Sequence, residues 1–175
     1  MIISVAEVKQ LIDFKGWSDQ KIERKLRAIE QTIRSYTNNR FQNTKVRMTC
    51  SVIGQDLYGV HTAINVGDTV QITESDYNEG LYVVNAVDTF DSLTTVDKSL
   101  ITETDVLVTK IEYPEDVINC CVNLLEWEIN NRSKVGIKSE TLSRHSVTYE
   151  DSATMVDGYP KSLFGCLKPY RKCRC

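Results

Sequence analysis

Charge and hydrophobic periodicity change together along this chain, at nearly the same two places. Residues 48–128 carry a net charge of −13, while the segments before and after them each carry +5. Apolar residues recur about every 3.6 positions in the outer segments, as in helices, and about every 2 positions in the middle, as in strands. The sequence therefore predicts an acidic β-rich module inserted into a more basic helical frame.

Two capped helices are predicted in the first segment. Ser4 and Glu7 match a capping box, and Ser18 is the expected N-cap of a second, longer helix. Gly16 is expected to end the first helix in the left-handed conformation, and Asn38 to end the second. The apolar stripe of the second helix steps by four and three positions through Ile22, Leu26, Ile29, Ile33 and Tyr36.

The middle of the chain predicts a small β module. Five β-prone runs are separated by turns, at 46–52, 66–72, 81–87, 93–96 and 106–111. Short strands at this spacing are typical of a small antiparallel barrel of SH3-like or OB-like type. A loop containing Gly54, Gly59 and His61 is expected between the first two strands.

Helical periodicity returns after the module. Pro114 opens a helix whose expected buried face is Val117, Ile118, Cys121, Leu124, Leu125 and Ile129. Trp127 lies off this stripe and predicts a second contact. Residues 133–158 are expected to form an extended arm, and a short last helix is expected to start at Pro160 and to stop at Pro169.

These elements define an α+β fold. Residues 1–44 and 112–175 are predicted to form a small α-helical bundle with an extended C-terminal arm and tail. Residues 45–111 are predicted to form the inserted antiparallel β-barrel-like module. We expect no membrane span and no signal peptide, and therefore a protein made in the cytoplasm.

The six cysteines are expected to be free thiols. Cys50 and at least one of Cys120 and Cys121 stand in apolar contexts typical of buried thiols. A zinc site near the C-terminus would have to use Cys166, Cys173, Cys175 and His145, whose spacing matches no zinc finger or ribbon. We expect no metal site and no cofactor.

Catalytic motifs are absent from the sequence: it has no Walker loop, dinucleotide-binding glycine motif, zincin motif or nucleophile elbow. Its acidic pairs fall on predicted exposed strands and turns, which rarely place two carboxylates across a pocket. We therefore expect no enzyme activity. A small hydrolase with an acidic pocket is one alternative.

Nucleic-acid binding by the predicted barrel is the main alternative. The acidic module is unlike a nucleic-acid reader, and Glu23 and Glu30 interrupt the bases of the second helix. Negative charge facing DNA has another use. The surface of a channel through which DNA moves can repel the phosphates, and attractive phosphate contacts that would slow the DNA are then avoided.

Both ends of the chain resemble one protein family. The N-terminal match is WSDQ at 17–20 followed by IRSYTNNRF at 33–41. The C-terminal match is GIKSE at 136–140, SRHSVTY at 143–149, GYP at 158–160 and LKPY at 167–170. These segments resemble the head–tail connector (adaptor) proteins of long-tailed bacteriophages and prophages of Gram-positive bacteria. The inserted β module departs from the pattern, because compact members join the second and third helices by a short loop.

The resemblance implies a structural protein of the virion, located in the phage neck and assembled in the host cytoplasm. Copies would form a ring, typically a dodecamer, between the portal protein and a tail-side stopper or completion protein, and DNA would pass through without specific binding. In such proteins the C-terminal segment commonly reaches the portal, which here implies Tyr159, Pro160, Leu163, Phe164, Leu167, Tyr170, Arg171 and Lys172. The arm would bridge neighbouring subunits through Ile137, Arg144, His145, Val147 and Tyr149. The alternative for the tail is that it packs on its own bundle.

Overall fold

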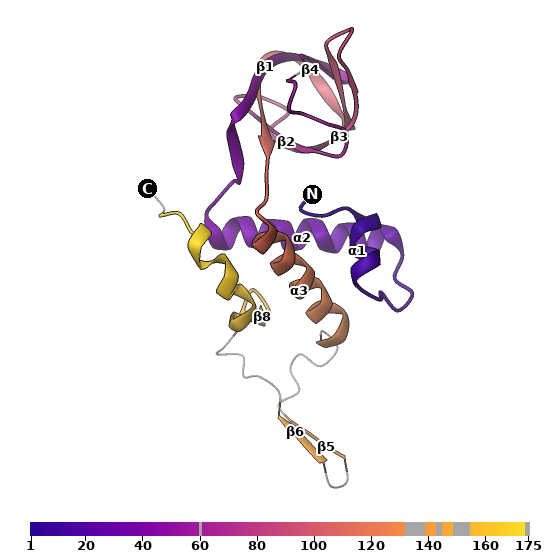
Figure 1. Ribbon diagram of the computed structural model, residues 1–175, viewed down its shortest axis with the longest axis vertical. Helices are drawn as coiled ribbons and strands as arrows, with labels where there is room; N and C mark the ends of the chain where they lie inside the picture. The colour runs from indigo at the N-terminus through magenta and orange to yellow at the C-terminus, as the bar shows by residue number, and fades with distance from the viewer. Residues whose placement is uncertain (60, 132–138, 143–144, 149–154, 174–175) are drawn as a thin grey trace. The chain divides into compact units, whose positions relative to one another are not determined.

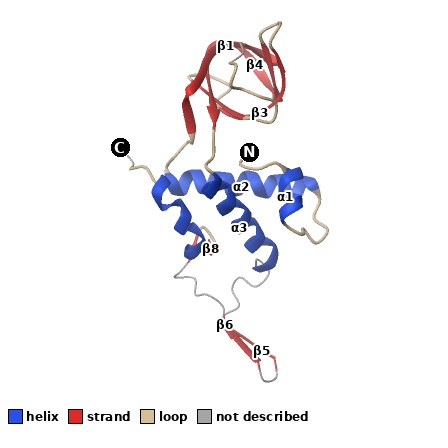
Figure 2. Ribbon diagram, in the orientation of Figure 1, coloured by secondary structure: helices blue, strands red, loops and turns tan. Residues whose placement is uncertain are grey.

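The computed structural model describes residues 1–59, 61–131, 139–142, 145–148 and 155–173 (Figure 1). It is an α+β structure that divides into two compact units. The β unit contains Met1 and Arg40–Tyr113, and the helical unit contains Ile2–Asn39 and Pro114–Cys175. The predicted insert, residues 45–111, lies inside the β unit. The described helices all belong to the helical unit, and the four-stranded sheet belongs to the β unit (Figure 2).

Helix α1 (Val5–Leu11) begins with the predicted capping box. The Ser4 hydroxyl accepts from the Glu7 N–H at 3.2 Å, and the Glu7 carboxylate accepts from the Ser4 N–H at 3.0 Å. The helix ends at Leu11, so the prediction that Gly16 terminates it is wrong. Gly16 does have a left-handed φ of 85°, but it lies in the loop that follows.

Helix α2 (Asp19–Thr37) has the predicted caps. The Ser18 hydroxyl accepts from the Lys21 N–H at 3.4 Å, and Asn38 ends the helix with a left-handed φ of 48°. Four predicted stripe residues are buried: Ile22, Leu26, Ile29 and Ile33. Tyr36 is half-buried, and Glu30 and Thr37 are buried as well. The apolar period could not identify these two polar residues.

Helix α3 (Glu115–Asn131) follows Pro114, and its buried residues differ slightly from the predicted face. Val117, Cys121, Leu124 and Leu125 are buried as expected. Ile118 and Ile129 are only half-buried, and Cys120 and Glu128 are buried in their place.

The second contact predicted for Trp127 is confirmed. Its ring centroid lies 5.4 Å from that of Tyr159. Tyr159 belongs to β8 (Tyr159–Pro160), which pairs with β7 (Met155–Val156). The 3₁₀ helix η3 (Lys161–Tyr170) follows and packs against α3 and α2. It continues through Pro169, which was expected to end it.

The β unit contains four strands rather than five, and the first and last of them are long. They are β1 (Gln42–Tyr58), β2 (Thr69–Thr73), β3 (Gly80–Asp88) and β4 (Leu93–Ile111). They form an antiparallel sheet in the order β1-β4-β2-β3, and β4 also pairs with β3. The antiparallel β module is thus confirmed, but no closed barrel is found among the described strands.

Strand β4 joins two of the predicted strands. The sequence predicts a turn in the polar stretch between 96 and 106, but this stretch stays paired with β1 through several register shifts. Gly54 of β1 lies at one of these shifts with a φ of +66°, a value that favours glycine. The strand therefore continues where hydrophobic alternation lapses, because its backbone still has a partner.

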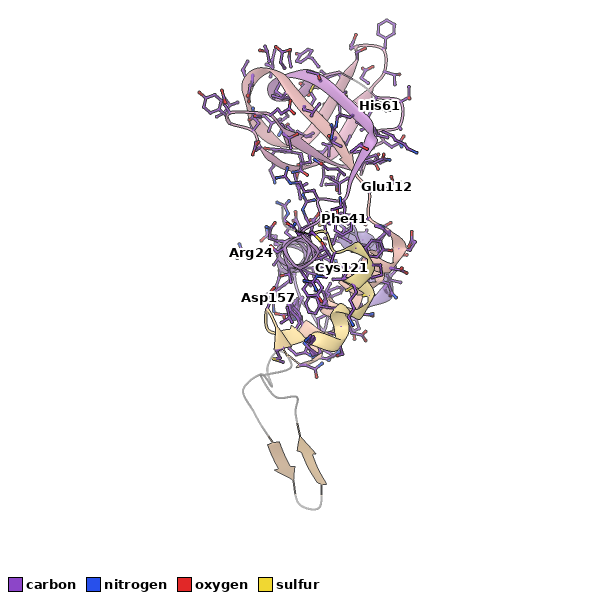
Figure 3. The ribbon with its side chains drawn as sticks, turned by 90° about the vertical axis from the view of Figure 1, so that its left-hand side faces the viewer. Arg24, Phe41, His61, Glu112, Cys121 and Asp157 are labelled. Carbon is purple, nitrogen blue, oxygen red and sulfur yellow. The ribbon has the colours of Figure 1, made fainter. Side chains whose placement is uncertain are left out.

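The sheet encloses its own apolar core, and its two chain ends meet. The Glu112 N–H donates to the Phe41 carbonyl at 2.9 Å, and the rings of Phe41 and Tyr113 lie 5.0 Å apart (Figure 3). The buried core consists of Val46, Cys50, Val52, Leu57, Ile64, Val70, Ile72, Tyr82, Val84, Val96, Leu100, Val106 and Val108.

The turn before β3 is fastened to β4 by a carboxylate. Glu103 accepts from the Ser75 hydroxyl at 2.5 Å, from the Asp76 N–H at 2.7 Å and from the Asn78 amide at 2.9 Å. The hydrogen bond from Ser75 lowers the pKa of Glu103, against partial desolvation, and the bonds from Asp76 and Asn78 add to the decrease.

Acid should therefore weaken the β unit through Glu103. A lowered folded-state pKa contributes stability that is complete above the unfolded value, about 4.3, and is lost as the pH falls through the folded value. We expect Glu103→Gln to flatten this part of the stability profile. Urea unfolding monitored by circular dichroism, with hydrogen exchange of the β4 amides, measures the effect. Glu79→Gln, at an exposed position, is the control, and an equal flattening there would contradict the prediction.

Candidate functional site

The first candidate site is the tail segment, residues Tyr159–Cys173, whose apolar side is buried in its own helical unit. Phe164 and Leu167 have no exposed surface, and Tyr159 is 7% exposed. The Phe164 ring lies 4.7 Å from the ring of Tyr36 on α2. In Figure 1 this segment runs beside α3. The structure thus shows the alternative in which the tail packs on its own bundle.

Hydrogen bonds hold the end of the tail segment against the C-terminus of α2. The Lys172 N–H donates to the Thr37 carbonyl at 2.8 Å, and the Asn39 amide donates to the Tyr170 carbonyl at 3.2 Å. Asn38 donates to the Cys173 carbonyl at 3.1 Å. The carbonyl groups of Tyr170 and Cys173 therefore accept hydrogen bonds from the two asparagines that follow α2.

Burial divides the side chains that were predicted to contact a portal. Tyr159, Pro160, Phe164 and Leu167 are buried, and Leu163 and Tyr170 are half-buried. Arg171 and Lys172 are exposed, and the Arg171 guanidinium lies 5.2 Å from the Tyr36 ring centroid. The docked segment thus exposes cations to solvent and keeps its large apolar groups inside.

The predicted inter-subunit arm is described only in part. Ile137, Arg144 and Tyr149 lie outside the described residues. The backbone of β5 (Ser139–Leu142) pairs with β6 (His145–Thr148), so that His145 is opposite Leu142 and Val147 is opposite Glu140.

The second candidate site is an exposed apolar trio on the β unit, consisting of Ile53, Tyr77 and Ile101. Their exposed fractions are 51%, 69% and 57%. Ile53 of β1 lies between residues that pair with Leu100 and Glu103 of β4, beside Ile101. Tyr77 is adjacent because the next residue, Asn78, exchanges two hydrogen bonds of 2.8 Å with the Ile101 backbone.

Three carboxylates belong to the same region. Asp76 directly precedes Tyr77, Glu79 follows it by two residues, and Glu103 accepts a hydrogen bond from the Asp76 N–H. The sequence did contain a signal for the trio, which we missed. Val52-Ile53 and Leu100-Ile101 are adjacent apolar residues in strands, so one member of each pair must face the solvent.

The two lysines of the acidic region are engaged within the β unit. Lys110 pairs with Asp68 at 2.6 Å and donates to the Ala63 carbonyl at 3.0 Å. Lys98 donates to the Leu81 carbonyl at 3.3 Å and lies 5.3 Å from the Tyr82 ring centroid. Each ammonium group is thus oriented by contacts inside its own unit.

The thiols of the described residues fall into two groups. Cys50, Cys120 and Cys121 are buried, which confirms the prediction of core thiols, while Cys166 and Cys173 are exposed. Burial raises the pKa of Cys50 to about 11; burial, followed by the charge of Glu30, raises the pKa of Cys121 to about 12. Figure 3 places Cys121 in the interior of the helical unit.

His61, in the loop after β1, has a structural contact. Its Nδ1 accepts from the Ala63 N–H at 3.2 Å. Within the described part of the chain, no three His, Cys, Asp or Glu side chains gather as metal ligands would.

Comparison with known proteins adds no assignment. Neither the models of known protein families nor a search of curated proteins gives a match to this sequence. In the described ranges, no helix has both the length and the apolar character required to cross a bilayer.

Burial of the tail segment predicts a large cost for truncating Phe164. Phe164→Ala should lower the free energy of unfolding of the helical unit by about 3–5 kcal/mol. Urea titration monitored by tryptophan fluorescence measures this, since Trp17 and Trp127 both belong to that unit. Leu11→Ala, at a side chain 64% exposed, should change the value by less than about 0.5 kcal/mol. Equal effects of the two substitutions would show that the tail segment is not docked in solution.

Proposed function

We propose that this protein is a structural head–tail connector (adaptor) of a tailed bacteriophage. Its copies form a ring between the portal and a tail-side stopper or completion protein, in the neck of the virion, after assembly in the host cytoplasm. One observation carries the proposal. The two chain ends that bear the family resemblance form one helical unit, apart from Arg40 and Phe41 at the end of the N-terminal match, and the segment foreign to the family forms a separate unit.

The connector-like bundle consists of α1, α2, α3 and η3 in this proposal. Its core brings residues from α2, such as Ile29, together with residues from α3 and η3, such as Leu124 and Phe164. Such a core lets the unit tolerate a long insertion between α2 and α3, because the entropy cost of closing a loop rises slowly with its length.

The exposed end of the tail segment is the proposed portal contact. Arg171 and Lys172 are held on a backbone that is hydrogen-bonded to α2, so they can pair with portal carboxylates without first ordering the chain. The buried residues Phe164 and Leu167 position the segment and take no direct part.

Charge supports a head-to-tail contact between copies. The β unit has five basic and eleven acidic residues, and the helical unit has sixteen basic and thirteen acidic residues. A ring interface joins two different faces of the same protein, so units of opposite net charge suit it. The apolar trio of Ile53, Tyr77 and Ile101 supplies an apolar centre bordered by acids.

The acid surplus of the β unit also supports passage of DNA without specific binding, because phosphates are repelled by it. The alternative function is nucleic-acid binding by this unit. Its two central lysines, Lys98 and Lys110, would then have to leave internal contacts. Salt-dependent binding of short DNA that is lost on Lys98→Ala with Lys110→Ala would favour this alternative.

Charge reversal at the end of the tail segment tests the portal contact. Arg171→Glu with Lys172→Glu should weaken binding to the portal protein of the same phage by about tenfold or more. Biolayer interferometry measures the affinity. Lys161→Glu with Lys168→Glu makes the same charge change at exposed positions of η3 and is the matched control. Failure of the unaltered protein to bind portal under any assembly condition would refute the proposed function.

The apolar trio is tested by ring formation on the portal. Ile53→Ser with Ile101→Ser should reduce complete rings about tenfold or more, because the apolar centre of the contact is lost. Negative-stain images count the rings. Val66→Ser with Phe90→Ser alters two other exposed apolar residues of the β unit, 64% and 93% exposed, and should leave ring formation intact. Equal loss in both double variants would show that the trio has no special role.

A further inference from the structure

Two thiols from distant parts of the chain converge on one carbonyl oxygen. Cys120 of α3 donates its S–H to the Leu163 carbonyl at 3.4 Å, and Cys166 of η3 donates to the same oxygen at 3.5 Å. Burial, followed by a hydrogen bond with the Cys166 thiol, raises the pKa of Cys120 well above its usual range. The sulfurs are therefore neighbours across the contact between α3 and η3.

The two thiols differ in access to solvent. Cys166 is exposed on η3, while Cys120 is only 1% exposed beneath it. An oxidant in solution therefore reaches Cys166 first. The buried thiol can then attack the modified sulfur, which is the order of events in many disulfide-forming pairs.

We propose that Cys120 and Cys166 form a reversible disulfide that fixes the tail segment on α3. A small disulfide such as oxidised glutathione is the oxidant. The Cys166 thiolate attacks one of its sulfurs and releases one glutathione thiolate. The Cys120 thiolate then attacks Cys166 Sγ and releases the second. Two protein thiols and one glutathione disulfide thus become one protein disulfide and two molecules of reduced glutathione.

Among the cysteines that the structure describes, the other three do not share this arrangement. Cys121 is adjacent to Cys120, but successive residues of a helix point about 100° apart, so only Cys120 faces η3. Cys50 belongs to the β unit. Cys173 lies beyond η3, where its carbonyl accepts from Asn38.

The bond would change how the tail segment can move. In the reduced protein the segment is held by buried side chains, chiefly Tyr159, Phe164 and Leu167. It can detach by local unfolding, at the free-energy cost of exposing these side chains to solvent. The oxidised protein closes a covalent loop from Cys120 to Cys166 and keeps η3 docked. This inference is independent of the proposed connector function, since it depends only on contacts within the helical unit.

The test uses the full chain, incubated with oxidised glutathione and mapped by mass spectrometry after alkylation and digestion. We expect a glutathione adduct on Cys166 first, followed by a Cys120–Cys166 cross-linked peptide that dithiothreitol removes. The second step should be faster at alkaline pH, because the raised pKa of Cys120 limits its thiolate. The midpoint of thermal unfolding of the helical unit should rise by about 5 °C or more on oxidation.

Two serine variants test whether the cross-link depends on Cys166. Cys166→Ser, at an exposed position, should abolish both the cross-link and the thermal shift, while Cys173→Ser should retain both. The proposal is overturned if Cys166 stays as a glutathione adduct at alkaline pH without the cross-link. It is equally overturned if Cys120 becomes linked to Cys173 or Cys175 instead.

Discussion

The helical unit depends on a geometric constraint. The chain enters the β unit after α2 and leaves it before α3, and these two points must lie close together. The hydrogen bond from the Glu112 N–H to the Phe41 carbonyl and the tilted contact between the Phe41 and Tyr113 rings meet this constraint. Because the entrance and exit of the β unit lie side by side, α2 and α3 can pack as if a short turn joined them. This closure is compatible with the core that α2, α3 and η3 form together.

Local patterns were sufficient to predict the helices, because caps and apolar stripes act over a few residues. Ser4, Ser18 and Asn38 have the capping roles that the sequence indicates. The strands were harder to delimit. The polar stretch of β4 between 96 and 106 lacks hydrophobic alternation, and it is a strand only because β1 supplies hydrogen-bond partners from far away in the chain. Window-based reasoning cannot recognise a partner that lies fifty positions earlier.

The candidate sites show the same limit. The sequence indicated that Phe164 and Leu167 form an apolar face, but both a partner protein and the bundle itself could cover such a face. The structure covers it with α2 and α3. Nothing in the sequence indicates that Glu128 is buried, because the charge of its carboxylate is paired with a residue of another helix. That residue is Lys25 of α2, whose ammonium lies 2.5 Å away. The convergence of Cys120 and Cys166 likewise follows from packing and not from their spacing.

The order of synthesis has a consequence for a helical unit that is assembled from both chain ends. The first two helices emerge from the ribosome well before α3 and η3 exist, so the stripe from Ile22 to Ile33 lacks the packing that α3 and η3 provide during that interval. The β unit, whose core is wholly contained in the middle of the chain, can fold at that stage. Its folding also shortens the effective tether between α2 and the helices still to come. The folded insertion thereby shortens the search by which α3 and η3 find α2 once they have been synthesised.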